Sequence, residues 1–153
     1  MHRALVLIWG LIFAISTSAY GQENFTVSGK ISFQEEKGQL CVWLRNLDEH
    51  DFYLKPAAPA RSLIIIPNQQ QLQAKKVTFK FVAVPKGFYC IFTFQDLNGN
   101  GIQDHSPQTG MAIEPYRFSG PPNSYRNWDD IKFEVDKDIS GIEIKFEFPD
   151  SSY

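Results

Sequence analysis

The chain has 153 residues, close to the modal size of a single domain, and its 13 phenylalanines supply apolar volume for one sizeable core. Its 17 Asp and Glu nearly balance its 15 Lys and Arg, and both signs are interspersed along the sequence. Because no block of basic residues is present, we do not expect nucleic acid to be a partner.

The N-terminus has the organisation of a secretory signal peptide. Three weakly cationic residues precede an apolar run of roughly a dozen residues, too short to cross a hydrocarbon core of about 30 Å. Ala19 and Gly21 are small residues at the minus three and minus one positions of a cut before Gln22. We therefore expect residues 1–21 to be removed, leaving a single secreted or periplasmic domain, residues 22–153, without a membrane span.

Alternation of apolar and polar residues with period two predicts a series of short strands separated by Gly, Pro and Asn. The predicted strands are residues 25–33, 39–46, 62–66, 76–84, 87–95, 131–135 and 142–148. Residues 68–75 can hold a short helix. The last two strands are joined by a turn-rich connector, which favours an antiparallel hairpin. The pattern predicts an all-β fold, an antiparallel β-sandwich of about seven strands of immunoglobulin-like or transthyretin-like kind.

Cys41 and Cys90 are the two cysteines of the chain, and each lies in a predicted buried strand. An even number of cysteines in an exported protein makes a disulfide possible. Free cysteine also packs well as a small buried apolar residue. The sequence leaves both interpretations open, because it does not show whether the two Cα atoms approach within about 7 Å.

The segment between the fifth predicted strand and the last two, residues 96–129, is longer than the loops usual in compact domains, so something is expected to order it. It begins Asp-Leu-Asn-Gly-Asn-Gly-Ile-Gln-Asp. This spacing matches the first half of a calcium-binding loop, in which oxygen ligands alternate and glycine stands at the sixth position. The candidate ligands are Asp96, Asn98, Asn100, the carbonyl of Ile102, and Asp104.

Two adjacent Asn-Gly turns without a metal are the alternative interpretation of this segment. The spacing of the two aspartates favours calcium as a structural cofactor, although Pro107 occupies the twelfth position, where an EF-hand has glutamate. Glu114 is the first candidate for closing the ligand shell; Asp129, Asp130 or water are the others. Two carboxylates and two amides predict a dissociation constant of about 10⁻⁴ to 10⁻³ M.

A second motif, Gly-Met-Ala-Ile-Glu, and a third, Tyr-Arg-Phe-Ser, follow the calcium-type segment at residues 110–114 and 116–119. Together with the apolar strand that begins at Gly87, these motifs resemble an uncharacterised family of small secreted bacterial proteins. That family has the patterns D-x-N-G-N-G-x-x-D, G-x-P-x-E and Y-G-F-S-N, and Ala112, Arg117 and Gly120 depart from them. The resemblance implies a fold and an exported location, with no assigned activity.

Four aromatic residues of the long segment are candidates for ligand contact: Tyr116, Phe118, Tyr125 and Trp128. They can stack on sugar rings, or they can pack the segment onto the sheet, which we favour. No catalytic arrangement is evident, so the sequence indicates a binding or interaction module for a protein or glycan rather than an enzyme. A carbohydrate-binding module is the first alternative, and a hydrolase with its site in residues 96–129 is the second.

Overall fold

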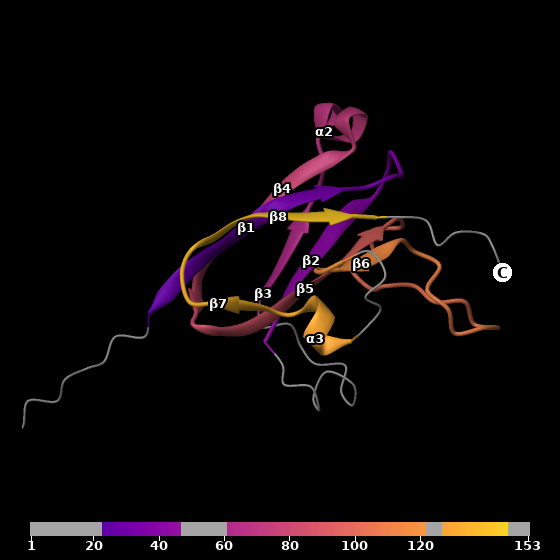
Figure 1. Cartoon of the computed structure of the whole chain (residues 1–153). Coiled ribbons are helices and arrows are strands. Elements are labelled where there is room, and N and C mark those ends of the chain that lie inside the picture. The colour runs from indigo at the N-terminus through magenta and orange to yellow at the C-terminus, as the bar shows by residue number, and fades with distance from the viewer. Residues whose placement is uncertain (1–22, 47–60, 122–126, 147–153) are drawn as a thin grey trace, which may run out of the picture.

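The computed structural model describes residues 23–46, 61–121 and 127–146 (Figure 1). The predicted signal peptide and Tyr125 lie outside these ranges. The described strands are β1 (Asn24–Ser32), β2 (Gln39–Arg45), β3 (Arg61–Ile65), β4 (Lys76–Pro85), β5 (Gly87–Asp96), β6 (Tyr116–Phe118), β7 (Phe133–Val135) and β8 (Ile139–Lys145). Two short helices accompany them, α2 (Gln69–Ala74) and α3 (Trp128–Ile131).

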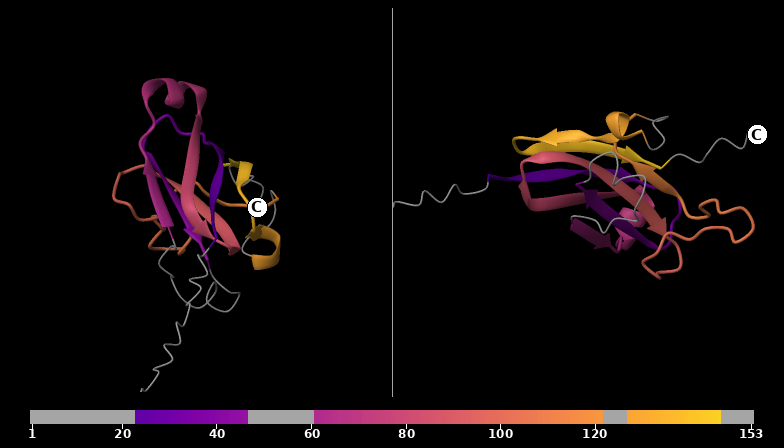
Figure 2. Two further views of the ribbon diagram at one scale, coloured as in Figure 1. Left: turned by 90° about the vertical axis from the view of Figure 1, so that its left-hand side faces the viewer. Right: turned by 90° about the horizontal axis from the view of Figure 1, so that it is seen from below.

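The strands form two sheets that pack against each other (Figures 1 and 2). One sheet has three strands in the order β4-β1-β8. The other has the order β3-β2-β5-β6, with β7 also paired to β5. The predicted all-β sandwich is therefore confirmed, and most of its pairs are antiparallel.

The core lies between the sheets and is built by period-two alternation. In β4 every second residue from Val77 to Phe81 is buried, while Lys76, Thr78 and Lys80 are exposed. The inward residues of the two sheets form one apolar cluster. This buried face fixes the strand register, because a shift by one residue would turn the apolar side chains towards solvent. That cluster includes Val27, Ile31, Phe79, Phe81 and Ile144 from the first sheet, and Leu40, Val42, Leu44, Tyr89 and Ile91 from the second.

The short helix expected near residue 70 is α2, and its boundaries have a local cause. Asn68 is the N-cap residue, and its side chain accepts a hydrogen bond from the Gln71 backbone N–H at 2.9 Å. The Gln71 side chain accepts one from the Asn68 N–H at 2.9 Å, which completes a capping box. Lys75, in the left-handed conformation, ends the helix.

The predicted hairpin of the last two strands is wrong. β7 pairs with the start of β5, and β8 pairs in parallel with β1 in the other sheet. Ile131 belongs to α3 rather than to a strand, and the final strand begins at Ile139, three residues earlier than predicted. The connector thus crosses between the sheets, and β8 covers an edge of β1 that a local hairpin would have left open.

The possible disulfide is not present: Cys41 and Cys90 are both free and buried. In the β2–β5 ladder Cys41 lies opposite Phe94, whereas Cys90 lies opposite Arg45. Four residues of strand separate the two positions, about 13 Å at the usual rise per residue, which exceeds the reach of a disulfide. Burial raises the pKa of Cys41 to about 11, with smaller contributions from the carboxylates of Asp96 and Glu114, and burial raises the pKa of Cys90 to about 12.

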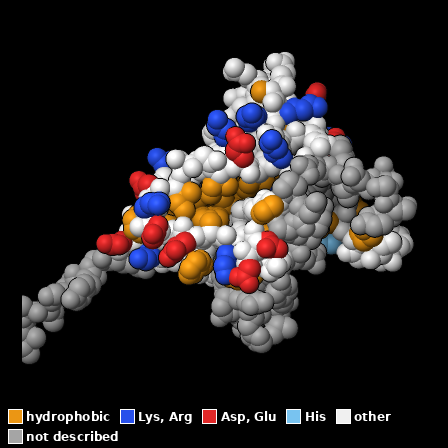
Figure 3. Space-filling view, viewed as in Figure 1, with side chains coloured by type: hydrophobic (Ala, Val, Ile, Leu, Met, Phe, Trp, Pro, Cys, Tyr) orange, Lys and Arg blue, Asp and Glu red, His pale blue; other side chains and the backbone are white. Residues whose placement is uncertain are grey.

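No helix among the described residues is long and apolar enough to cross a membrane. On the face seen in Figure 3, Lys and Arg side chains alternate with Asp and Glu around an apolar strip, so charges of both signs are mixed there.

Candidate metal loop

The calcium-type segment starts where β5 ends and projects from one end of the sandwich, in salmon to orange in Figures 1 and 2. Asp96 is the last residue of β5 and lies opposite Gln39 of β2. The rigid β2–β5 ladder therefore fixes the first residue of the loop, while residues 97–104 extend beyond the sheet.

Asp96 is completely buried, and its carboxylate organises the loop. Oδ1 accepts hydrogen bonds from the backbone N–H groups of Gly99 at 2.7 Å and Asn100 at 3.2 Å. Oδ2 accepts from the Gly101 N–H at 2.7 Å and from Nε2 of Gln39 at 2.8 Å. Burial by itself raises the pKa of Asp96, but these hydrogen bonds outweigh it and lower the pKa below its ordinary value.

Glycines at two loop positions allow these N–H groups to converge on Asp96. Gly99 and Gly101 have φ angles of +78° and +76°, in the left-handed region that other residues rarely adopt. The two Asn-Gly pairs are therefore tight turns wrapped around one carboxylate. The Asn-Gly pattern, which also predicts two turns without a metal, is thus what shapes the calcium-type loop.

Asn98, Asn100 and Asp104 converge on the exposed side of the loop. Nδ2 of Asn98 lies 2.5 Å from Oδ2 of Asp104, and Nδ2 of Asn100 lies 3.1 Å from Oδ1 of Asp104. The amide oxygens of Asn98 and Asn100 accept the backbone N–H groups of Asn100 and Ile102 at 3.0 and 2.7 Å. Each amide oxygen has a second lone pair that can face a cation.

Glu114, the first candidate for closing the ligand shell, reaches the loop and contacts its backbone groups. Its side chain is buried, with 5% exposure. Oε1 accepts the Leu97 N–H at 2.7 Å, and Oε2 accepts the Asp104 N–H at 3.1 Å. The carboxylate therefore bridges the start and the end of the loop.

The other candidates for closing the shell lie on α3, where they have local partners. Asp129 pairs with Nζ of Lys132, and Oδ2 of Asp130 accepts from Nδ2 of Asn127 at 2.9 Å. Within the described ranges, no three His, Cys, Asp or Glu side chains gather into a metal-binding group. A cation at the loop would thus depend on amide, carbonyl and water oxygens beside the carboxylate of Asp104.

A small hairpin continues the loop and ties it back to the sheet. The Ile113 N–H donates to the Asp104 carbonyl at 2.9 Å, and His105 forms an isolated bridge with Ala112. After Glu114, β6 pairs with β5, so the long segment is ordered by backbone pairing as well as by Glu114.

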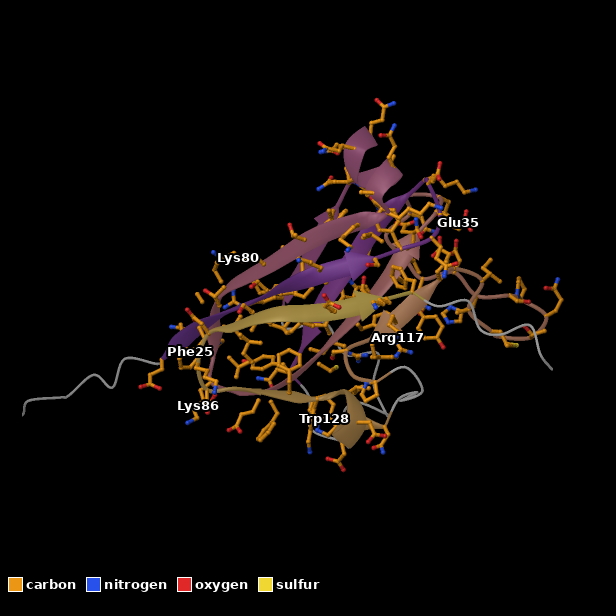
Figure 4. All side chains as sticks on the ribbon, turned by 45° about the horizontal axis from the view of Figure 1, so that its top comes forward. Phe25, Glu35, Lys80, Lys86, Arg117 and Trp128 are labelled. Carbon is orange, nitrogen blue, oxygen red and sulfur yellow. The ribbon has the colours of Figure 1, made fainter. Side chains whose placement is uncertain are left out.

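The candidate aromatic residues within the described ranges, Tyr116, Phe118 and Trp128, pack on the face of the five-stranded sheet that points away from the core. The Phe118 ring lies 4.8 Å from that of Phe92, and the Tyr116 ring lies 6.0 Å from it. Trp128, labelled in Figure 4, is 6% exposed and packs with Cys90 and Ile131.

Trp43 is a further member of this aromatic cluster that the sequence analysis did not identify. Its ring is tilted at 57° and 87° to those of Phe92 and Phe94, at centroid distances of 5.6 and 5.5 Å. The sequence contains a signal for it, because Trp43 alternates with Val42 and Leu44 and so faces away from the core.

A family model described as "Uncharacterized protein conserved in bacteria" matches residues 30–142. No curated protein and no solved structure matches the chain.

Proposed function

For this chain, which belongs to the family of uncharacterised bacterial proteins DUF2141, we propose a function as an exported binding module. In this proposal loop 96–104 holds a structural calcium ion. The proximity of Asn98 and Asn100 to Asp104, whose carboxylate accepts hydrogen bonds from their amide nitrogens, carries the calcium part of the proposal. These residues occupy the third, fifth and ninth positions of a calcium loop, and their oxygens are of the hard type that Ca²⁺ prefers.

In this proposal the two aspartates have different roles. Asp104 supplies the negative charge on the exposed side of the loop. Asp96 already accepts four hydrogen bonds, so its main contribution is to hold the turns that present Asn98 and Asn100. The carbonyl of Ile102 and water complete the shell. A site with so few carboxylates is weak, in the range of extracellular modules.

The test of the calcium site is calorimetric titration of the mature domain with CaCl₂ and, separately, with MgCl₂. We expect calcium to bind with a dissociation constant of about 10⁻⁴ to 10⁻³ M, and magnesium to bind more weakly because it releases water reluctantly. Asp104→Asn, which keeps the shape of the side chain and removes its charge, is expected to abolish the calcium heat. Absence of heat in the wild-type protein would leave only two metal-free turns.

The proposal of a binding module rests on the exposed apolar side chains around this loop. Ile102, Met111 and Ile113 are all more than half exposed, and they lie on the projecting loop and its hairpin. Large apolar side chains left exposed on a projecting loop are typical of interaction surfaces, and here they favour a protein partner over a glycan. Glycan binding has less support, because the aromatic rings interlock at steep angles and Trp128 is buried.

The exported location is part of the proposal and rests on the predicted signal peptide, residues 1–21. Outside the cell or in the periplasm, calcium is available at concentrations that suit a weak structural site. A buffering or sensing role inside the cell would need much tighter binding.

A further inference from the structure

Glu114 holds two backbone N–H groups that neither the sheets nor the Asp96 carboxylate satisfies. These are the N–H groups of Leu97, the second residue of loop 96–104, and Asp104, its last, at 2.7 and 3.1 Å. The two residues are seven positions apart in sequence, and each contacts a different oxygen of one carboxylate. A single buried side chain therefore sets the distance between the two ends of the loop.

The chemistry of this contact differs from that of a metal ligand. A buried carboxylate is stabilised when each of its oxygens accepts an N–H, and such charge-assisted hydrogen bonds are among the strong ones. Asp96 holds the middle of the same loop through Gly99, Asn100 and Gly101. The loop thus has two internal carboxylates that accept hydrogen bonds from its backbone, Asp96 in the middle and Glu114 at the two ends.

We infer that Glu114 is a positioning residue that closes loop 96–104 whether or not calcium is bound. The inference deepens the proposed calcium site and rests on it for its biological meaning, but the hydrogen bonds on which it depends do not involve calcium. It follows that calcium would enter a loop that is already folded. Metal binding would then add stability without a disorder-to-order switch, and the hairpin that carries Met111 and Ile113 would keep its place in both states.

The test is amide hydrogen exchange, resolved by NMR, on calcium-free mature protein in a chelator. We expect the amides of Leu97 and Asp104 to exchange at least about tenfold more slowly than an unstructured reference, as backbone groups with buried acceptors do. In Glu114→Gln only one oxygen remains to accept, so exchange at one or both amides should accelerate by about tenfold. The amides of Gly99 and Gly101 should change by less than about twofold, because Asp96 holds them.

Glu134→Gln is the matched control, since it makes the same chemical change on an exposed residue of β7, and it should alter none of these amides. Intrinsic exchange rates at Leu97 and Asp104 in the wild-type protein would overturn the inference, even if Glu114→Gln failed to fold. A Glu114→Gln protein with unchanged calcium-free exchange and lost calcium affinity would also overturn it, because Glu114 would then be a ligand. Absence of calcium binding with protected amides would refute the proposed metal site and still support the role of Glu114.

Discussion

At the scale of single residues, Asp96 and Asp104 illustrate how position in the structure separates two identical side chains. Both stand at ligand positions of the calcium-type sequence. Asp96 is completely buried and accepts four hydrogen bonds, whereas the Asp104 side chain contacts exposed amides. The first is part of the fold, and in the proposed site the second supplies the charge for a cation.

Alanine substitution should therefore distinguish the two aspartates in calcium-free protein. Asp96→Ala leaves several loop N–H groups without a buried acceptor, and we expect it to lower the free energy of unfolding by at least about 3 kcal/mol. Asp104→Ala removes contacts that water can replace, so its cost should stay within about 1 kcal/mol. Urea unfolding in a chelator measures both, and equal costs would contradict the assignment of separate roles.

The two cysteines give a second residue-scale prediction. Since burial raises the pKa of Cys41 to about 11 and that of Cys90 to about 12, almost no thiolate is present at pH 8. We expect neither thiol to react with a maleimide in the folded protein, and both to react in denaturant. Mass spectrometry without reductant counts the adducts, and a failure to label two thiols in unfolded protein would indicate a bridge.

The same pKa shifts predict a pH dependence at high pH. A thiol whose pKa is higher in the folded protein than its ordinary value of 9.0 keeps its proton longer when folded. The contribution of each thiol to the free energy of unfolding is complete below pH 9. It is lost as the pH rises from 9 to about 11 for Cys41 and about 12 for Cys90, because only the unfolded chain ionises in that range.

At the scale of elements, the parallel pair of β1 and β8 depends on a close approach at Gly29. A Cβ atom added at Gly29 would lie 2.1 Å from the Ile142 carbonyl oxygen and 2.7 Å from the Phe79 ring. Backbone on one side and a buried ring on the other leave no room for it. Gly29 therefore sets the distance between β8 and β1.

Gly29→Ala should then destabilise the domain by about 3 kcal/mol or more, because the overlap forces the two strands apart. Gly141→Ala is the matched control in β8: its φ of +80° strains an alanine, but an added Cβ would meet nothing within 4 Å. That strain should cost about 1 to 2 kcal/mol. Thermal or urea unfolding compares the two, and a Gly29→Ala cost no larger than that of Gly141→Ala would refute the close approach.

Sequence patterns predicted the strands better than their partners. Alternation marked β4 to within a residue, since one of its faces points towards the core. The predicted bounds of β5 were as close, although this strand is an apolar run that is buried on both faces. It could not show that β7 and β8 belong to different sheets, because the partners of a strand are far away in sequence. The candidate loop was partly predicted as well, since the spacing of Asp96 and Asp104 indicated that they belong to one loop. Hydrogen bonds from a side chain to backbone N–H groups, such as those of Glu114, cannot be predicted from residue types, because every residue except proline has the same N–H group.

At the scale of the whole molecule, the proposed export determines where the sandwich would act. The signal-peptide pattern predicts cleavage before Gln22, where small residues stand at the required positions. When the full chain is expressed in a bacterium, mass spectrometry of the periplasmic or secreted protein should find an N-terminus within a few residues of Gln22. Exported protein that retains residues 1–21 would contradict the prediction.

The central claim is that the projecting loop takes up calcium as a structural ion, and the melting temperature of the mature domain tests it most directly. At about 10 mM calcium and a dissociation constant of about 10⁻⁴ to 10⁻³ M, linkage predicts about 1.4 to 2.7 kcal/mol of stabilisation, a rise of roughly 4 °C or more over the protein in chelator. Equal magnesium should raise the melting temperature much less, and Asp104→Asn should remove the calcium effect. Identical melting temperatures in calcium and in chelator for the wild-type domain would contradict the claim.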